Sequence, residues 1–491
     1  MSPGPASYDE SRSCDYGAPQ KCPLRLVDDY ESLRLFPLAP AAAFGFLAVQ
    51  GWELGLGFGD PMRKSGRSMD EMAGVSRRSF LRTAAAAGGT LAAGSAFAQD
   101  AALQALINQH QRGSLGQGFD SASRTIPMPK ASLPTLSQQT VEHTGQAIAQ
   151  YESIVSRGGW RPISAAEGLQ LGNRHPEVMA LRERLTAGGD LDPAAGMSDV
   201  FDSYVEAAVE RFQVRHGLNA DGVVRSHTLA AINVPAQTRL AQLRINLSRL
   251  RSLTGNLGNR FVVCNIPAAH IEAIQDGVAV SRHTAVVGKP DRASPEISSR
   301  IVEINFNPFW TVPVSIVRRD LIPYMQDDPE YLSKNFIRIY DGKGTELQPS
   351  QIDWYSQEAV SYRFRQDPGD FNSLGSIRIN FPNKHAVYMH DTPARNLFGE
   401  DMRFHSSGCV RVQNVRELVH WLLAETPNWR PEDVAAVLKS GERKDARIAR
   451  PVPLYWVYVT AWATPDGVVQ FRDDIYNRDG LGIVASQTQP G

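Results

Sequence analysis

Cys409 is the residue with the strongest potential for covalent chemistry, because a short turn-forming segment precedes it. Residues 403–414 read Arg-Phe-His-Ser-Ser-Gly-Cys-Val-Arg-Val-Gln-Asn. A thiol attacks a carbonyl carbon as the thiolate, and an unperturbed cysteine is only a few per cent ionised at neutral pH. An imidazole that removes the proton would make Cys409 an effective nucleophile.

His390 is the candidate for that imidazole. It lies 19 residues before Cys409, in the run Tyr-Met-His-Asp-Thr-Pro at 388–393. A strand, a loop and a turn could bring the two side chains together, and the imidazole could then protonate a leaving amine. Gly408 permits a tight turn and a close approach of the backbone. Backbone N–H groups beside the nucleophile could hold a developing oxyanion.

Other interpretations of these residues remain open. His390, Asp391, His405 and Cys409 could bind zinc in a metal-dependent envelope peptidase, although their spacing fits no zinc motif. A disulfide between Cys264 and Cys409 would make Cys409 structural, whereas a thiol in an early apolar strand is more typical of a core residue. The third alternative is a binding protein without catalytic activity.

A β-rich domain at 258–475 is expected to position these side chains. Alternating apolar patterns and turn signals predict an antiparallel domain, interrupted by a helix-rich insertion, or lid, at about 314–360. A helix is expected at 414–425. Strands are expected at 261–266, 283–287, 301–306, 377–380 and 386–390, and a closing hairpin at 454–463 and 468–471.

Helical segments precede this domain. Residues 141–164 and 236–257 are expected to contribute one scaffold helix each, and 165–235 a small three-helix domain. Its helices are predicted at Pro176–Leu185, Phe201–His216 and from Ser226 to Ile232. Gly217 is the expected C-cap of the second helix and Ser226 the expected N-cap of the third.

The N-terminal part has the pattern of an export signal. Ser76-Arg77-Arg78 and a short Ala/Gly-rich run precede Ala96-Phe97-Ala98, which predicts twin-arginine export and cleavage after Ala98. Residues 1–98 would then be an extension and signal peptide, with translation starting at one of the methionines at 62, 69 or 72. Residues 99–140 are expected to be a flexible arm, and 476–491 a C-terminal tail. The mature protein would lie in the periplasm with no permanent membrane span.

The composition excludes several classes of protein. The chain has 491 residues, 51 Lys and Arg, 52 Asp and Glu, and a net charge of −1. This balance gives no electrostatic reason to expect nucleic acid as a partner. Four cysteines are too few for a disulfide scaffold.

Several ordered motifs resemble the L,D-transpeptidase (YkuD-type) family, and the chain as a whole resembles its large, YcbB-like branch. The strand-borne His390 and the segment Ser406-Ser407-Gly408-Cys409-Val410-Arg411 are its marks. The resemblance extends through segments at 307–313 (Asn-Pro-Phe-Trp-Thr-Val-Pro), 368–369, 374–375, 381–383 and 458–462. Residues 208–229 resemble a three-helix peptidoglycan-binding module, through Phe-Gln at 212–213, Gly-Leu at 217–218, Asp-Gly at 221–222 and Thr-Leu at 228–229.

The resemblance implies a role for each site residue. Cys409 would be the nucleophile, and His390 the proton acceptor and donor. Gly408 and Cys409 would supply the oxyanion-hole N–H groups, Ser407 would help to shape that turn, and the backbone carbonyl of Asp391 would orient His390. Arg411 would support the loop or bind a substrate carboxylate, and Tyr388 and Trp310 would line the groove for the acyl donor. Many family members carry histidine where this chain has Ser407, which puts any role for a histidine at that position in doubt.

The resemblance also implies an α+β multidomain enzyme without a cofactor or metal. Cys409 would acylate on a peptidoglycan tetrapeptide stem, release D-Ala and pass the acyl group to a second stem as a 3→3 cross-link. A lipoprotein or a free D-amino acid could replace the second stem as acceptor. Carbapenems are expected to acylate Cys409.

Overall fold

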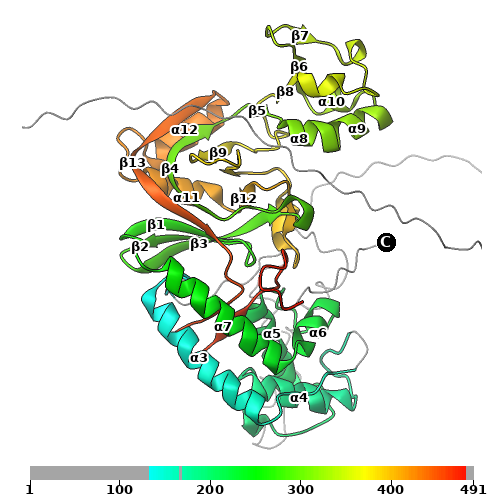
Figure 1. The fold of residues 1–491 in the computed structure, drawn as a ribbon, viewed down its shortest axis with the longest axis vertical. Coiled ribbons are helices and arrows are strands. Elements are labelled where there is room, and N and C mark those ends of the chain that lie inside the picture. Colours follow the sequence, from blue (N-terminus) through cyan, green and yellow to red (C-terminus); the bar gives the residue numbers. More distant parts are fainter. Residues whose placement is uncertain (1–131, 165–167, 483–491) are drawn as a thin grey trace, which may run out of the picture. The chain divides into compact units, whose positions relative to one another are not determined.

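The computed structural model describes residues 132–164 and 168–482, and element labels follow Figure 1. The predicted signal peptide, its cleavage site and most of the predicted arm lie outside the described residues. Within the described part of the chain, no helix combines the length and the apolar character needed to cross a membrane.

Two long helices form the scaffold, as the sequence predicts. The N-cap of α3 (Gln138–Ser156) is Ser137, whose hydroxyl accepts a hydrogen bond from the Thr140 N–H. α7 (Ala236–Leu253) runs beside it (Figure 1). The apolar side chains of both helices share a core with a small hairpin of β14 (Ala461–Ala463) and β15 (Val469–Phe471).

Three further helices form a separate core. They are α4 (Glu177–Ala187), α5 (Ser203–His216) and α6 (Ser226–Asn233). Gly217 ends α5 in the left-handed region, with φ of 72°, as predicted. The N-cap prediction for Ser226 was wrong. Arg225 has the extended backbone of a cap residue, and Ser226 is already the first residue of the helix.

A nine-stranded sheet is the centre of the molecule, in the order β11-β3-β12-β10-β9-β4-β13-β1-β2. Its strands are β1 (Arg260–Asn265), β2 (His270–Gln275), β3 (Val278–Gly288), β4 (Ile297–Phe306), β9 (Ile377–Asn380), β10 (Met389–His390), β11 (Phe404–Ser406), β12 (Val410–Val412) and β13 (Lys444–Val457). Helices α11 (Val415–Leu423) and α12 (Pro431–Ser440) share the main apolar core with this sheet (Figure 1).

The prediction of an antiparallel domain was wrong in part, because the sheet is mixed. β1 pairs in parallel with β13, β10 with β12, and β11 with β3. Parallel neighbours require a long connection, and long segments do separate these strands in the chain. The predicted strand at 454–463 is also divided: its first part lies in β13, and its last residues form β14 in another sheet.

The insertion contains a sheet as well as helices, which the prediction of a helix-rich segment missed. β5 (Trp310–Thr311), β8 (Arg363–Gln366), β6 (Ile337–Tyr340) and β7 (Glu346–Leu347) form it in that order. α8 (Val314–Ile316), a π-helical turn η4 (Val317–Leu321), α9 (Ile322–Asp327) and α10 (Tyr331–Lys334) complete it. The insertion has an apolar core of its own.

Buried amides join the scaffold to the end of the main sheet. Asn246 Nδ2 donates to Thr460 Oγ1 at 2.7 Å, and Asn246 Oδ1 accepts from the Thr460 N–H at 2.8 Å. Gln242 Nε2 reaches the carbonyl of Arg472 at 2.9 Å. Buried polar groups that lose their partner destabilise a fold, so these contacts fix where β13 leaves the sheet.

We expect Asn246→Ala to lower the free energy of unfolding by about 2–3 kcal/mol, because it leaves two groups of Thr460 without that partner. Urea denaturation of the full chain measures this. Glu152→Ala is the control, because it removes only the exposed ion pair between Glu152 of α3 and Arg244 of α7. Its effect should stay below about 1 kcal/mol. Equal effects of the two variants would contradict the assigned role of Asn246.

Candidate active site

Parallel pairing of two short strands places His390 and Cys409 on one face of the main sheet. In β10 and β12, His390 lies opposite Arg411 and Met389 opposite Val410. Side chains alternate between faces along a strand, and Met389 and Val410 are fully buried in the core. His390 and Cys409 therefore lie on the other face, as diagonal neighbours on adjacent strands.

The imidazole of His390 is oriented by the next residue in the chain. Nδ1 lies 2.6 Å from the carbonyl oxygen of Asp391, the contact that the sequence predicts. A carbonyl only accepts, so Nδ1 carries the proton and Nε2 is the basic nitrogen. Burial, reinforced by the charges of Arg411 and Arg378, lowers the pKa of His390 to about 3. The imidazole is therefore neutral at physiological pH.

The thiol of Cys409 is also neutral in the resting site. Burial raises its pKa to about 11, against the opposing effects of hydrogen bonds from Tyr388 and of the charges of Arg378 and Arg411. At neutral pH about one thiol in ten thousand is ionised. Attack on a carbonyl thus requires a base that takes the proton as the new bond forms.

Tyr388 connects Cys409 to the inserted segment. Its hydroxyl accepts a hydrogen bond from Trp310 Nε1 at 3.2 Å. Its ring lies edge-on to the imidazole of His390, with 5.7 Å between the ring centroids. Burial raises the pKa of the Tyr388 hydroxyl, so it is a donor at neutral pH.

Two arginines bring positive charge to this face. Arg378 of β9 and Arg411 of β12 both lie opposite His390. Their Nε atoms are buried, and neither has a hydrogen-bond partner among the described residues. Burial lowers the pKa of Arg411, but a guanidinium remains charged at neutral pH. The pair favours negative charge that develops near Cys409.

The turn before Cys409 depends on Ser406 more than on Ser407. Ser406 Oγ accepts from the Gly408 N–H at 3.1 Å and donates to the Cys409 carbonyl at 2.5 Å. The Gly408 N–H, expected to face an oxyanion, is therefore occupied in this structure. Among the described residues, no hydrogen-bond partner of the Cys409 N–H is present. That N–H is consequently the available donor.

Gly408 is required for its backbone angle rather than for space. Its φ is +110°, which side chains rarely adopt. An added Cβ would meet its nearest neighbour, Val387, at an ordinary 3.6 Å. The expectation that glycine is needed here for a close approach of the backbone was therefore wrong.

A second turn holds the residue that orients His390. Asp391 Oδ2 accepts from the Ser376 N–H at 3.1 Å and from the Ser376 hydroxyl at 3.0 Å. A Cβ on Gly375 would lie 2.6 Å from the Asp391 side chain, and φ at Gly375 is +57°. The predicted Leu-Gly motif at 374–375 thus serves the close packing of Asp391.

The geometry also separates residues that the alternatives grouped together. Cys264 and Cys409 are both free, so the proposed disulfide is absent. Cys264 is fully buried in β1, as expected of a core thiol. His405 Nε2 lies 2.7 Å from both Glu400 Oε2 and the carbonyl of Met402. In the described ranges, no three or more His, Cys, Asp or Glu side chains are grouped so that they could hold a metal.

Two segments of the chain match known protein families. Residues 259–432 match the family described as "L,D-transpeptidase catalytic domain", YkuD. They are a YkuD-type L,D-transpeptidase domain. Residues 174–232 match the family described as "Putative peptidoglycan binding domain". The family resemblance of both segments is thereby confirmed.

Individual relatives cover only part of this protein or resemble it weakly. A protein from Haemophilus influenzae named "Putative L,D-transpeptidase" is 35% identical over 239 residues, which are 48% of this chain and 48% of the relative. The chain thus spans about half the length of that relative.

Solved L,D-transpeptidase structures include those from Xylanimonas cellulosilytica and Stackebrandtia nassauensis. They are 15% and 12% identical, and each match covers 60% of this chain and 98% or 97% of the other. Their TM-scores of 0.20 and 0.23 are too low to support further argument.

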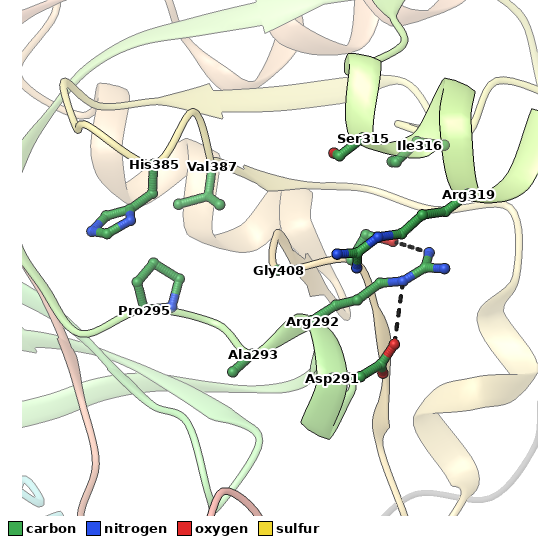
Figure 2. A pocket seen from close by; sticks show the side chains of 11 residues that line it. Asp291, Arg292, Ala293, Pro295, Ser315, Ile316, Arg319, His385, Val387 and Gly408 are labelled. Carbon is green, nitrogen blue, oxygen red and sulfur yellow. Dashed lines mark hydrogen bonds and ion pairs between the residues drawn. The ribbon is translucent and has the colours of Figure 1, made fainter. Parts of the chain in front are cut away.

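A pocket of about 310 Å³ borders the turn that precedes Cys409. Ser407 and Gly408 line it, together with Arg292 from the loop after β3 and Arg319 from the insertion. Figure 2 shows Arg319 extending from the inserted helices toward Arg292, with His385 on the opposite side. The pocket therefore lies between the insertion and the main sheet.

Sequence reasoning missed four residues that contact the candidate site: Arg292 and Ser294 at the turn before Cys409, Ser376 at Asp391 and Arg378 opposite His390. The signal for Arg378 was available, because Ile-Arg-Ile-Asn at 377–380 alternates and puts Arg378 on the polar face. The others reach the site from distant segments, so no local pattern indicates them.

We expect Gly375→Ala to displace Asp391 and with it the imidazole of His390. The thermal midpoint should fall, and the Nδ1–H proton resonance of His390 should shift. Gly342→Ala is the matched control, because no atom lies within 4 Å of its Cβ position. An unshifted His390 resonance in Gly375→Ala would show that this contact does not set the imidazole.

We expect Cys409 to react slowly with iodoacetamide at pH 7 and about tenfold faster per pH unit up to pH 9. Since its pKa is raised to about 11, the reactive thiolate grows with pH throughout this range. Peptide mapping by mass spectrometry gives the rate for each cysteine, and Cys264, whose thiol is fully buried, should stay unlabelled. A plateau below pH 8 would mean that Cys409 is a preformed thiolate.

Proposed function

We propose that this protein is a cysteine L,D-transpeptidase that forms 3→3 cross-links between peptidoglycan stems in the cell envelope. The observation that carries the proposal is the placement of Cys409 and His390 on one sheet face inside a YkuD-type domain. The neutral states of both groups suit a mechanism in which His390 moves the proton during attack.

The first half-reaction acylates Cys409. Sγ attacks the carbonyl carbon of the third stem residue while His390 Nε2 takes the thiol proton. The Cys409 N–H stabilises the oxyanion, and the positive charges of Arg378 and Arg411 favour the same build-up of charge. His390 then gives its proton to the amine of D-Ala, which leaves, and a thioester remains on Cys409.

The second half-reaction transfers the acyl group. The side-chain amine of a second stem attacks the thioester carbon and loses a proton to His390. When the tetrahedral intermediate collapses, the thiolate leaves and His390 returns the proton to it. One amide bond is broken and one is formed, so no external energy source is required.

Substrate recognition is assigned to two places. Tyr388 and Arg411 act directly on Cys409, and Trp310 donates to the Tyr388 hydroxyl. These three residues are proposed to hold the acyl donor. The module at 174–232 is proposed to hold the polymer, in agreement with its family description. The twin-arginine segment around Arg77 supports export to the periplasm, where the polymer lies.

We expect a carbapenem to form a covalent adduct on Cys409, visible as a mass increase equal to the drug. Cys409→Ala should abolish the adduct and the formation of 3→3 dimers from purified tetrapeptide stems. Cys264→Ala is the matched control and should retain both. If the wild-type protein forms neither adduct nor dimers but still binds peptidoglycan, a non-catalytic binding role is favoured.

A further inference from the structure

The loop after β3 contacts all three residues of the turn that precedes the proposed nucleophile Cys409. This turn, residues 406–408, is called the nucleophile turn below. The Lys289 N–H donates to the Ser406 carbonyl at 2.9 Å, Arg292 Nη1 to Ser407 Oγ at 3.0 Å, and Ser294 Oγ to the Gly408 carbonyl at 2.9 Å. This loop supports the turn over its whole length immediately before Cys409. Two of these residues also contact other parts of the protein: the Ser294 N–H donates to the Tyr476 hydroxyl at 3.2 Å, and Arg292 reaches the inserted segment.

Arg292 binds the inserted segment with the same guanidinium. Nη1 lies 2.7 Å from Asp320 Oδ2, and Nη2 lies 2.9 Å from Asp320 Oδ1. A two-pronged arginine–carboxylate pair fixes both distance and orientation. The side chains are only 18% and 25% exposed, and the hydrogen bonds with Asp320 raise the pKa of Arg292.

Asp320 occupies an unusual position in the insertion. It lies in the π-helical turn Val317–Leu321, whose two terminal residues are buried in the core of the insertion. Short π-helical turns are rare and occur frequently at functional sites. Because the ends of this turn are buried in the core of the insertion, Asp320 moves whenever the insertion moves. Arg292, which is bound to Asp320, is then displaced as well.

We propose that Arg292 is a positioning residue that makes the geometry of the nucleophile turn depend on the position of the inserted segment. The chain of contacts is Asp320–Arg292–Ser407, and it ends one peptide unit before the Cys409 N–H. In this chain of contacts the Ser407 hydroxyl accepts the hydrogen bond from Arg292 that links the turn to the insertion. This inference rests on the proposed function, because the position of the Cys409 N–H matters only if that group binds an oxyanion during acylation.

Two reactions of Cys409 separate positioning from simple stability. Acylation by a carbapenem requires a stabilised oxyanion, whereas alkylation by iodoacetamide requires only a reachable thiol. A variant that disturbs the turn should lose the first reaction and keep the second. Labelling of Cys264, which is fully buried, reports any variant that fails to fold.

The experiment compares Ser407→Ala, Asp320→Asn and the double variant. Each single change should lower the acylation rate constant about five- to tenfold, the equivalent of one neutral hydrogen bond. The acylation rate constant of the double variant should equal that of the more impaired single variant, because both changes interrupt one chain of contacts. Alkylation of Cys409 should stay within about twofold of the wild type.

Arg292→Lys and Arg318→Gln complete the set. Lysine keeps the charge but lacks the planar fork, so Arg292→Lys should behave like Asp320→Asn. Arg318 is an exposed neighbour in the same π-helical turn, and Arg318→Gln should react like the wild type in both assays.

Two results would overturn the inference: effects of the single changes that multiply in the double variant, or alkylation that falls in parallel with acylation. A wild-type protein that is alkylated but never acylated would instead refute the proposed function, and the inference with it.

Discussion

The parallel pairing of β10 with β12 is the constraint on which the site depends. These strands contribute only two and three residues, yet their register decides which face carries His390 and Cys409. A shift by one residue would turn both side chains into the core. The register is fixed by Met389 and Val410, which fill the apolar core, and by β9 and β3, which flank the pair. The chemistry of one face is thus set by packing on the other.

Burial gives the site its resting state. It raises the pKa of the Cys409 thiol and lowers that of the His390 imidazole, so both groups remain neutral. Arg378 and Arg411 add positive charge that acts on any anion formed there. The arrangement holds little thiolate at rest and favours negative charge when a carbonyl is attacked.

Contacts from distant parts of the chain reach the segment between the two reactive residues. Asp401 lies in this segment and accepts a hydrogen bond from the Asn219 N–H at 2.6 Å. It also pairs with His227 at 3.6 Å, and the hydrogen bond to Asp401 raises the pKa of that histidine. Both partners belong to the three-helix domain, which therefore packs directly on the loop that joins His390 to Cys409.

The sequence by itself determined the two domain families and most helices, because these depend on local patterns. Residue type also made Cys409 and His390 the candidates for catalysis, and the end of an apolar repeat identified Gly217 as a cap. The tertiary structure alone decided that Ser406 occupies the Gly408 N–H and that the sheet is mixed. It alone placed Arg292 between Ser407 and Asp320. Arg292 is 28 positions from Asp320 and 115 from Ser407, and strand pairing joins segments far apart in the chain, so no local pattern of residue types encodes these contacts. Ser406 and Gly408 are only two positions apart, but residue types do not say which of two neighbouring serines accepts from the Gly408 N–H.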